Sequence, residues 1–179
     1  MKYFDTHAHY EDDTFLENQQ EVLQNCREAG VTYIVNVGCN VASSQKSVAL
    51  ANSHSYIYAA IGIHPHDVGK DSVESLKRIY EDSNANKIVA IGEIGLDYAF
   101  VKENKKEQIE LFEEQIMLAN QFKLPVVIHA RDAALDTYET IMRRKPEYGA
   151  LFHCFQPSDD LVRLVLQEGY FVAFGGNIT

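Results

Sequence analysis

Short apolar runs rich in β-branched and aromatic residues recur along the chain and predict β-strands. There are seven of them, at residues 3–5, 33–37, 56–61, 87–91, 126–128, 150–152 and 170–174. Each run is almost continuously apolar instead of alternating between apolar and polar residues. This pattern is typical of parallel strands that are buried on both faces.

Amphipathic segments lie between these runs and predict helices. Their apolar positions recur at helical spacing: Leu16, Leu23 and Cys26; Val73, Leu76, Ile79 and Tyr80; Ile109, Phe112, Ile116, Ala119 and Phe122; Thr137, Tyr138, Ile141 and Met142; and Leu161, Val165 and Leu166. Gly30 follows the first of these stripes as a candidate C-cap, and Ser72 precedes another as a candidate N-cap. Gly169 comes after the last stripe.

Strand and helix alternate along the chain with short joins, which predicts an α/β protein made of βα units in one domain over residues 1–179. Periodicity leaves two architectures open, a doubly wound open sheet and a TIM (β/α)8 barrel. Chemically active side chains at the C-terminal ends of several different strands favour the barrel. The sequence contains about seven of its strands, so we expect a truncated barrel.

The net charge is −10, from 16 basic and 26 acidic residues, which argues against a protein held on nucleic acid by a broad basic face. A nucleic-acid substrate remains possible, because bound divalent metals can reverse the sign of the charge in a site. No apolar stretch reaches the roughly 20 residues that span a bilayer. With no signal-peptide pattern either, we expect a soluble, cytoplasmic protein without a membrane partner.

The cysteines give no sign of a disulfide framework or of a thiolate zinc site. Cys26, Cys39 and Cys154 are odd in number, lie far apart and form no CxxC pair.

Histidines gather at or just after the C-terminal ends of the predicted strands. His7 and His9 follow the first strand, His64 and His66 the third, His129 ends the fifth, and His153 ends the sixth. Glu93 follows the fourth strand. Imidazole and carboxylate suit zinc, manganese and similar divalent ions, so these residues predict a metal site. A shared carboxylate could hold two metals, which activate water and clamp the oxygens of a displacement at phosphorus.

Each of these signals is weak when it stands alone. A single histidine at a strand end is more often a hydrogen-bonded structural residue than a metal ligand. A buried glutamate is better evidence, because an unpaired buried charge is costly. Ligand-type residues at four different strand ends would rarely coincide by chance, so the set carries the prediction.

Six motifs occur in order along the chain. They are Asp5-Thr6-His7-Ala8-His9, Gly62-Ile63-His64-Pro65-His66, Gly92-Glu93-Ile94-Gly95-Leu96-Asp97-Tyr98, Pro125-Val126-Val127-Ile128-His129-Ala130-Arg131-Asp132-Ala133, His153-Cys154-Phe155 and Gly175-Gly176-Asn177-Ile178-Thr179. Together they resemble the TatD family of deoxyribonucleases, in the superfamily of metal-dependent hydrolases. The resemblance implies a TIM barrel that hydrolyses DNA phosphodiesters with metal ions, commonly as an exonuclease acting at 3′ or 5′ ends.

The resemblance also implies two divalent metal ions, with magnesium, manganese and zinc as candidates, and a ligand set. By position, His7 and His9 would hold one metal, Glu93 would bridge the two, and His129 and His153 would hold the second.

Other matching residues would act on the substrate. His64 and Arg131, and with them His66, would contact the phosphate or the leaving group, a task that suits the planar fork of arginine. For Arg131 and His66, a surface ion pair or a turn position is an equal alternative. Asp97 is expected to orient a ligand or to cap a turn.

The sequence departs from the family pattern at its end. In the family a further strand ends in a Glu-Thr-Asp motif, whose Asp would bind the first metal and act as the general base, whereas this sequence stops at Thr179. We therefore expect open strand edges, possible self-association, and weakened metal binding and turnover. Two alternatives stay open: a metal-dependent hydrolase of another ester or an amide, and an inactive metal-binding fragment.

Overall fold

Parallel strands form one sheet in which the order in space follows the order in sequence. The structure is a computed structural model and describes residues 1–83 and 85–175. Its strands are β1 (Tyr3–Ala8), β2 (Val31–Val37), β3 (Ile57–Ile61), β4 (Ile88–Asp97), β5 (Val126–Arg131), β6 (Ala150–Phe152) and β7 (Phe171–Val172). They pair in the order β1-β2-β3-β4-β5-β6-β7, and every pairing is parallel.

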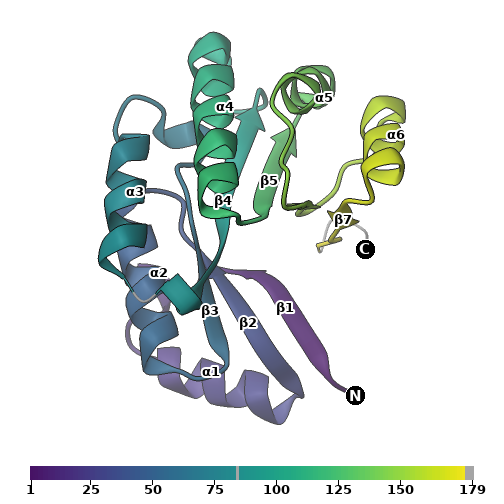
Figure 1. The fold of residues 1–179 in the computed structure, drawn as a ribbon. Coiled ribbons are helices and arrows are strands. Elements are labelled where there is room, and N and C mark those ends of the chain that lie inside the picture. Colours follow the sequence, from purple (N-terminus) through teal and green to yellow (C-terminus); the bar gives the residue numbers. More distant parts are fainter. Residues whose placement is uncertain (84, 176–179) are drawn as a thin grey trace.

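This strand order decides between the two architectures that the sequence left open. A doubly wound sheet reverses its strand order at a switch point, and this sheet does not. Figure 1 shows the sheet curved into a half-barrel, with the helices on its outer side and with β1 and β7 at the open ends. The prediction of an α/β barrel truncated after about seven strands is confirmed.

Helices connect successive strands and cover the outer face of the sheet. They are α1 (Gln19–Glu28), α2 (Val41–Ser53), α3 (Val73–Asp82), α4 (Lys105–Phe122), α5 (Ala134–Arg143) and α6 (Asp159–Glu168), with short 3-10 turns η1 (Asp13–Phe15), η2 (Pro65–Asp67) and η3 (Ala85–Lys87). Ser72 caps α3 by accepting a hydrogen bond from the Ser75 N–H, as predicted, and Gly169 ends α6 with a φ of 66°.

Two features of the helices differ from the expected stripes. Helix α2 has no apolar stripe in the sequence, because small residues such as Ser44, Ser47 and Ala51 form its buried face. Leu16 and Leu166, in contrast, were expected in stripes but are 72% and 77% exposed. In α6 the buried face instead contains Leu161 and Leu164, which are three residues apart.

The main core lies between the sheet and the helices. It includes Ile34, Ile57, Ile91, Phe112 and Ile116, all fully buried. A smaller cluster of Val35, Val37, Ala60, Ala90 and Val127 lies apart from this core. Because side chains of a strand alternate between its two faces, this arrangement gives the sheet an apolar inner face as well.

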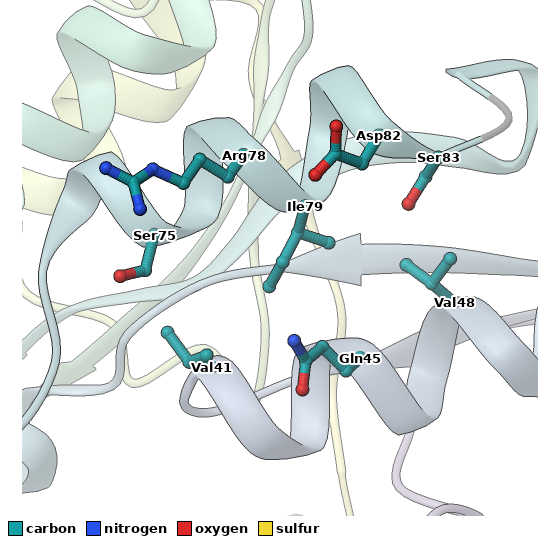
Figure 2. A pocket seen from close by; sticks show the side chains of 8 residues that line it. All are labelled: Val41, Gln45, Val48, Ser75, Arg78, Ile79, Asp82 and Ser83. Carbon is teal, nitrogen blue, oxygen red and sulfur yellow. The ribbon is translucent and has the colours of Figure 1, made fainter.

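Two cavities lie away from the strand ends that carry the histidines. One, of about 520 Å³, is lined by residues of the inner face together with residues of the outer strands β1 and β7, including Val35, Ala90, Val127, Phe4 and Phe171. The other, of about 430 Å³, is a groove between α2 and α3 (Figure 2). Neither is lined by any of the predicted metal ligands.

Residues 176–179 of the last sequence motif lie outside the described residues. Within the described ranges, no helix combines the length and the apolar character that crossing a membrane requires.

Candidate metal centre

The predicted ligands converge at the carboxyl ends of the strands, around the Glu93 side chain. Glu93 is only 4% exposed and lies inside β4, which continues to Asp97. His7 lies in β1 and His129 in β5, so these strands also run further than the apolar pattern indicated. His9 and His153 directly follow β1 and β6. The separate strand ends therefore do meet at one place, as the sequence predicted.

One oxygen of Glu93 faces the histidines of the first strand. Glu93 Oε2 lies 3.2 Å from His7 Nε2 and 3.7 Å from His9 Nε2. The two imidazole nitrogens lie 3.0 Å from each other. The three side chains therefore turn their donor atoms toward a common point.

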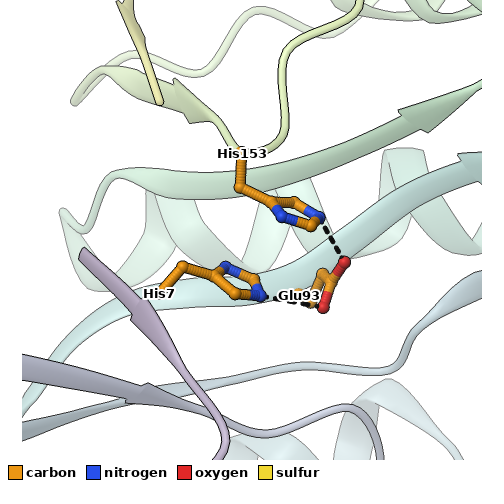
Figure 3. Close-up of side chains that lie close together, drawn as sticks. All are labelled: His7, Glu93 and His153. Atoms are coloured by element: carbon orange, nitrogen blue, oxygen red, sulfur yellow. Dashed lines mark ion pairs between the residues drawn. The ribbon is translucent and has the colours of Figure 1, made fainter. Parts of the chain in front are cut away.

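The other oxygen of Glu93 faces the histidines of the fifth and sixth strands. Glu93 Oε1 lies 2.9 Å from His129 Nδ1 and 2.5 Å from His153 Nε2, and these nitrogens are 3.2 Å apart. Figure 3 shows Glu93 between His7 and His153, with one carboxylate oxygen turned toward each. His64 Nε2 is a further neighbour of Oε1, at 3.6 Å.

Hydrogen bonds at the far side of two rings fix which nitrogen carries the proton. His9 Nδ1 lies 2.7 Å from the Val37 carbonyl oxygen, so it must donate. His129 Nε2 lies 3.0 Å from Asp97 Oδ2 and donates to that carboxylate. In the neutral rings, the lone pairs therefore sit on His9 Nε2 and His129 Nδ1, which face Glu93. Metal-binding histidines are commonly oriented by such partners.

These residues fit a divalent metal. Lone pairs and carboxylate oxygens that face one another at about 3 Å repel unless a proton or a cation lies between them. Metal–nitrogen and metal–oxygen bonds of about 2.0–2.2 Å place neighbouring ligands of a tetrahedral ion about 3.3 Å apart. Three of the spacings are close to this value: 3.2 Å from Glu93 Oε2 to His7 Nε2, 3.0 Å between His7 and His9, and 3.2 Å between His129 and His153.

Comparison with known proteins identifies the family of the chain. The family model described as TatD related DNase matches residues 4–179. The chain belongs to the TatD family. Its membership makes it a metal-dependent hydrolase by family, and the motifs quoted above are the TatD motifs on which the resemblance rested.

Individual TatD relatives cover nearly the whole chain. An uncharacterized metal-dependent hydrolase, YabD of Bacillus subtilis, is 37% identical over 177 residues, which are 98% of this chain and 69% of YabD. A protein named 3′-5′ ssDNA/RNA exonuclease TatD, from Erwinia tasmaniensis, is 30% identical and covers 97% of this chain and 68% of its own length. The chain thus spans about two thirds of the length of the curated relatives it matches.

Solved structures of the TatD family share the fold. The crystal structure of YjjV, a TatD homologue from Escherichia coli, superposes with a TM-score of 0.91 at 31% identity, covering 99% of this chain and 69% of YjjV. A TatD-family hydrolase from Entamoeba histolytica has a TM-score of 0.87 at 23% identity, with coverage of 99% and 66%, which supports the fold alone.

The electrostatics of the TatD centre favour a charged glutamate beside some neutral histidines. Burial raises the pKa of Glu93, but hydrogen bonds with His129, His153 and His7 outweigh it and hold that pKa well below its ordinary value. Burial lowers the pKa of His7, and it lowers the pKa of His64 to about 4. Near neutral pH, Glu93 is therefore anionic, and His7 and His64 are neutral.

Two other histidines bind protons more tightly in the metal-free centre. Burial lowers the pKa of His9, but contacts with Cys39 and Glu11 outweigh burial and raise it to about 11. Burial likewise opposes the charged form of His129, while its hydrogen bond with Glu93 raises its pKa. Metal binding must displace these protons, so metal affinity depends on pH.

The residues expected to contact substrate surround this centre. His64 caps η2: its Nδ1 accepts a hydrogen bond from the His66 N–H at 3.2 Å, so its Nε2 carries the proton and faces Glu93. His66 Nε2 lies 3.0 Å from Asp97 Oδ2. Arg131 is exposed at the end of β5, and its guanidinium lies 4.6 Å from the centre of the Phe100 ring.

Asp97 takes both of the structural roles that the sequence suggested. Its Oδ2 accepts from His129 Nε2, which orients that ring. Its Oδ1 accepts from the N–H groups of Ala99 and Phe100, which caps the turn after β4.

Two buried glutamines of α4 position the site and were missed in the sequence. Gln115 Oε1 accepts from the Ile63 N–H at 2.7 Å, and its Nε2 donates to the Ile63 carbonyl at 3.0 Å. Gln108 makes the equivalent pair of bonds to the backbone of Asp97, at 2.9 and 3.2 Å. Ile63 precedes His64, so both glutamines fix segments that carry site residues. Their spacing of seven residues, next to an apolar stripe, was the available signal.

Replacing Gln115 with leucine will destabilise the protein and misplace His64. Leucine fills similar space but leaves the N–H and C=O of Ile63 unpaired in a fully buried place. We expect the free energy of unfolding to fall by about 2–4 kcal/mol, because each lost partner costs about 1–3 kcal/mol. Urea unfolding measures the change. Gln121→Leu, at an exposed position of the same helix, is the matched control and should change it by less than about 0.5 kcal/mol. Equal effects of the two substitutions would refute a positioning role.

Proposed function

We propose that this chain provides the metal centre of a hydrolase that cleaves phosphodiester bonds at DNA ends. In this proposal His7 and His9 hold one divalent ion, His129 and His153 hold a second, and Glu93 bridges them. The observation that carries the proposal is the division of the histidines between the two oxygens of Glu93. Magnesium, manganese and zinc are all compatible with these ligand types.

Charge and hydrogen bonding at the site suit a phosphodiester. When bound, two divalent ions supply the positive charge that balances a phosphate and lower the pKa of an attacking water. His64 Nε2–H points into the centre and can donate to a phosphate oxygen. Arg131 stands at the rim with its planar guanidinium held over Phe100, and can pair with a second oxygen. In this proposal His64 and Arg131, together with Glu93, are the catalytic residues.

The nucleic-acid substrate is the finer part of the proposal. Several relatives that are 30–32% identical are named 3′-5′ ssDNA/RNA exonucleases, which favours a free single-stranded end. Arg131 and the exposed Phe100 form a cationic and aromatic pair beside the centre, and such pairs suit a phosphate with its adjacent base.

An end-labelled oligonucleotide tests this function directly. We expect the chain with added magnesium or manganese to shorten single-stranded DNA stepwise from one end, and a chelator to stop the reaction. His153→Ala should remove the activity, and His54→Ala is the matched control, because His54 contacts Ser53 and Tyr56 far from Glu93. If the chain hydrolyses an ester or an amide but leaves DNA uncut, the proposed DNA substrate is wrong. If it binds metal but hydrolyses none of these substrates, the proposed enzymatic activity is wrong.

We also propose that the 179-residue chain on its own associates through its open strands. Phe4 of β1 and Phe171 of β7 are 58% and 74% exposed, and both line the apolar cavity inside the half-barrel. Unpaired strand edges and apolar patches favour contact with a second copy. Light scattering should give a mass well above 20.3 kDa.

Two lysine substitutions distinguish this association from nonspecific aggregation. Phe4→Lys should shift the chain toward monomer, whereas Leu166→Lys, on the outer side of α6, should leave the mass unchanged. A monomeric unmodified chain would contradict the proposal.

A further inference from the structure

Cys39 lies next to the metal centre although no cysteine pattern in the sequence indicates a metal site. It follows β2 by two residues, and its backbone is fixed to the surrounding segments. Its N–H donates to Ser43 Oγ at 2.8 Å, and its carbonyl accepts from the His64 N–H at 2.8 Å. The preceding residue, Gly38, accepts from the Glu93 N–H at 2.9 Å. The thiol is therefore held at a defined place relative to Glu93.

The sulfur of Cys39 faces the same carboxylate oxygen as the histidines of β1. Its Sγ lies 3.7 Å from Glu93 Oε2, and it lies 4.0 Å from His9 Nδ1, the nitrogen of that ring that donates to the Val37 carbonyl. Cys39, His9 and Glu93 each offer one donor atom within 4.8 Å of the others. A zinc ion with bonds of about 2.3 Å to sulfur and about 2.0 Å to oxygen would place those two ligands about 3.5 Å apart. The observed sulfur–oxygen distance is close to this spacing.

We propose that Cys39 is a sulfur ligand of the metal held by His9 and Glu93. On binding, the thiol loses its proton to solvent, and the thiolate coordinates the ion. This inference rests on the proposed metal centre and adds a soft donor to a set of imidazole and carboxylate ligands. Soft thiolate favours zinc or cobalt and is a poor partner for magnesium. The first half of the centre is thus selective for thiophilic ions.

The remaining cysteines do not share this position. Cys26 Sγ contacts the Tyr10 hydroxyl at 3.2 Å, and Cys154 is exposed. Cys154 is nonetheless adjacent in sequence to His153, a proposed ligand of the other metal. Both therefore serve as controls, and Cys154 is the more stringent one.

The ultraviolet–visible absorption spectrum of the cobalt-bound chain reports which atoms coordinate the metal, and it does not depend on catalytic activity. We expect visible ligand-field bands together with a thiolate-to-cobalt charge-transfer band in the near ultraviolet. A Cys26→Ser/Cys154→Ser double variant, in which Cys39 is the sole thiol, should keep that band. Cys39→Ser should lose the band, keep the visible bands and bind zinc about tenfold more weakly or worse, with magnesium affinity changed by less than about twofold.

The outcomes separate this inference from the metal centre on which it rests. Visible bands without a charge-transfer band, in the unmodified chain or in the double variant, would overturn the role of Cys39 and leave the centre intact. The absence of any cobalt spectrum would contradict both. The double variant retains Cys39, so the test stands even where Cys39→Ser fails to fold.

Discussion

Replacing Glu93 with glutamine will lower metal-dependent hydrolysis by about a thousandfold or more, the largest effect on activity that we expect from one substitution. Glutamine preserves the shape of the side chain but carries no charge. One of its terminal atoms becomes an NH₂ group, which cannot bind a metal. Because the two oxygens of Glu93 face different histidine pairs, the substitution weakens both halves of the centre.

Metal content and turnover should fall together in Glu93→Gln. Metal analysis after equilibration with manganese or zinc measures the first, and nucleotide release from single-stranded DNA measures the second. Glu114→Gln is the matched control, because Glu114 is exposed on α4. A folded Glu93→Gln variant that keeps both metal and more than a tenth of the activity would show that this carboxylate is no bridge.

The convergence of the candidate ligands could be predicted from the sequence because each of these residues follows a local signal. Parallel strands bring their carboxyl ends to one side of the sheet, so His7, Glu93, His129 and His153 had to approach one another once the strands were recognised. The strand order, in contrast, could not be predicted from the apolar pattern, because a doubly wound sheet and a barrel share the same local pattern. Only the pairing of β1 through β7 decided it.

The parts that were missed depend on contacts between distant segments. Gln115 acts on Ile63, which is 52 residues away in the chain, and Cys39 approaches Glu93, which is 54 residues away. Neither residue has a local pattern that marks its partner. Helix α2 was missed for a different reason. It packs closely on β3 through serine and alanine, so its sequence lacks the stripe of large apolar residues by which a helix is predicted.

Hydrogen bonds around the candidate ligands also fix the backbone of the strands that carry them. Asp97 orients His129 and is itself held by Gln108, so the end of β4 is fixed from both sides. The pairing of β4 with β5 sets the distance between Glu93 and His129. Residues that allow these strands to approach are therefore as important to the centre as the ligands.

Replacing Gly95 with alanine will have the largest expected effect on stability. Gly95 pairs with His129 in the β4–β5 register and has a φ of +137°, a conformation that side chains disfavour. An added Cβ would lie 2.0 Å from the His129 carbonyl oxygen, so the two strands must separate locally. Strain and overpacking each cost about 1–3 kcal/mol, and we expect the free energy of unfolding to fall by about 3–5 kcal/mol.

A substitution at Gly149 distinguishes the steric clash of an added Cβ from the strain of a positive φ. It also has a positive φ, of +99°, but an added Cβ would meet nothing within 4 Å. Gly149→Ala should therefore cost only the conformational strain, about 1–2 kcal/mol, in the same urea unfolding experiment. In addition, Gly95→Ala should weaken metal binding because it displaces His129, whereas Gly149→Ala should not. Similar unfolding free energies for the two variants would mean that β4 and β5 tolerate separation at Gly95, and that the close approach of these strands does not hold His129 against Glu93.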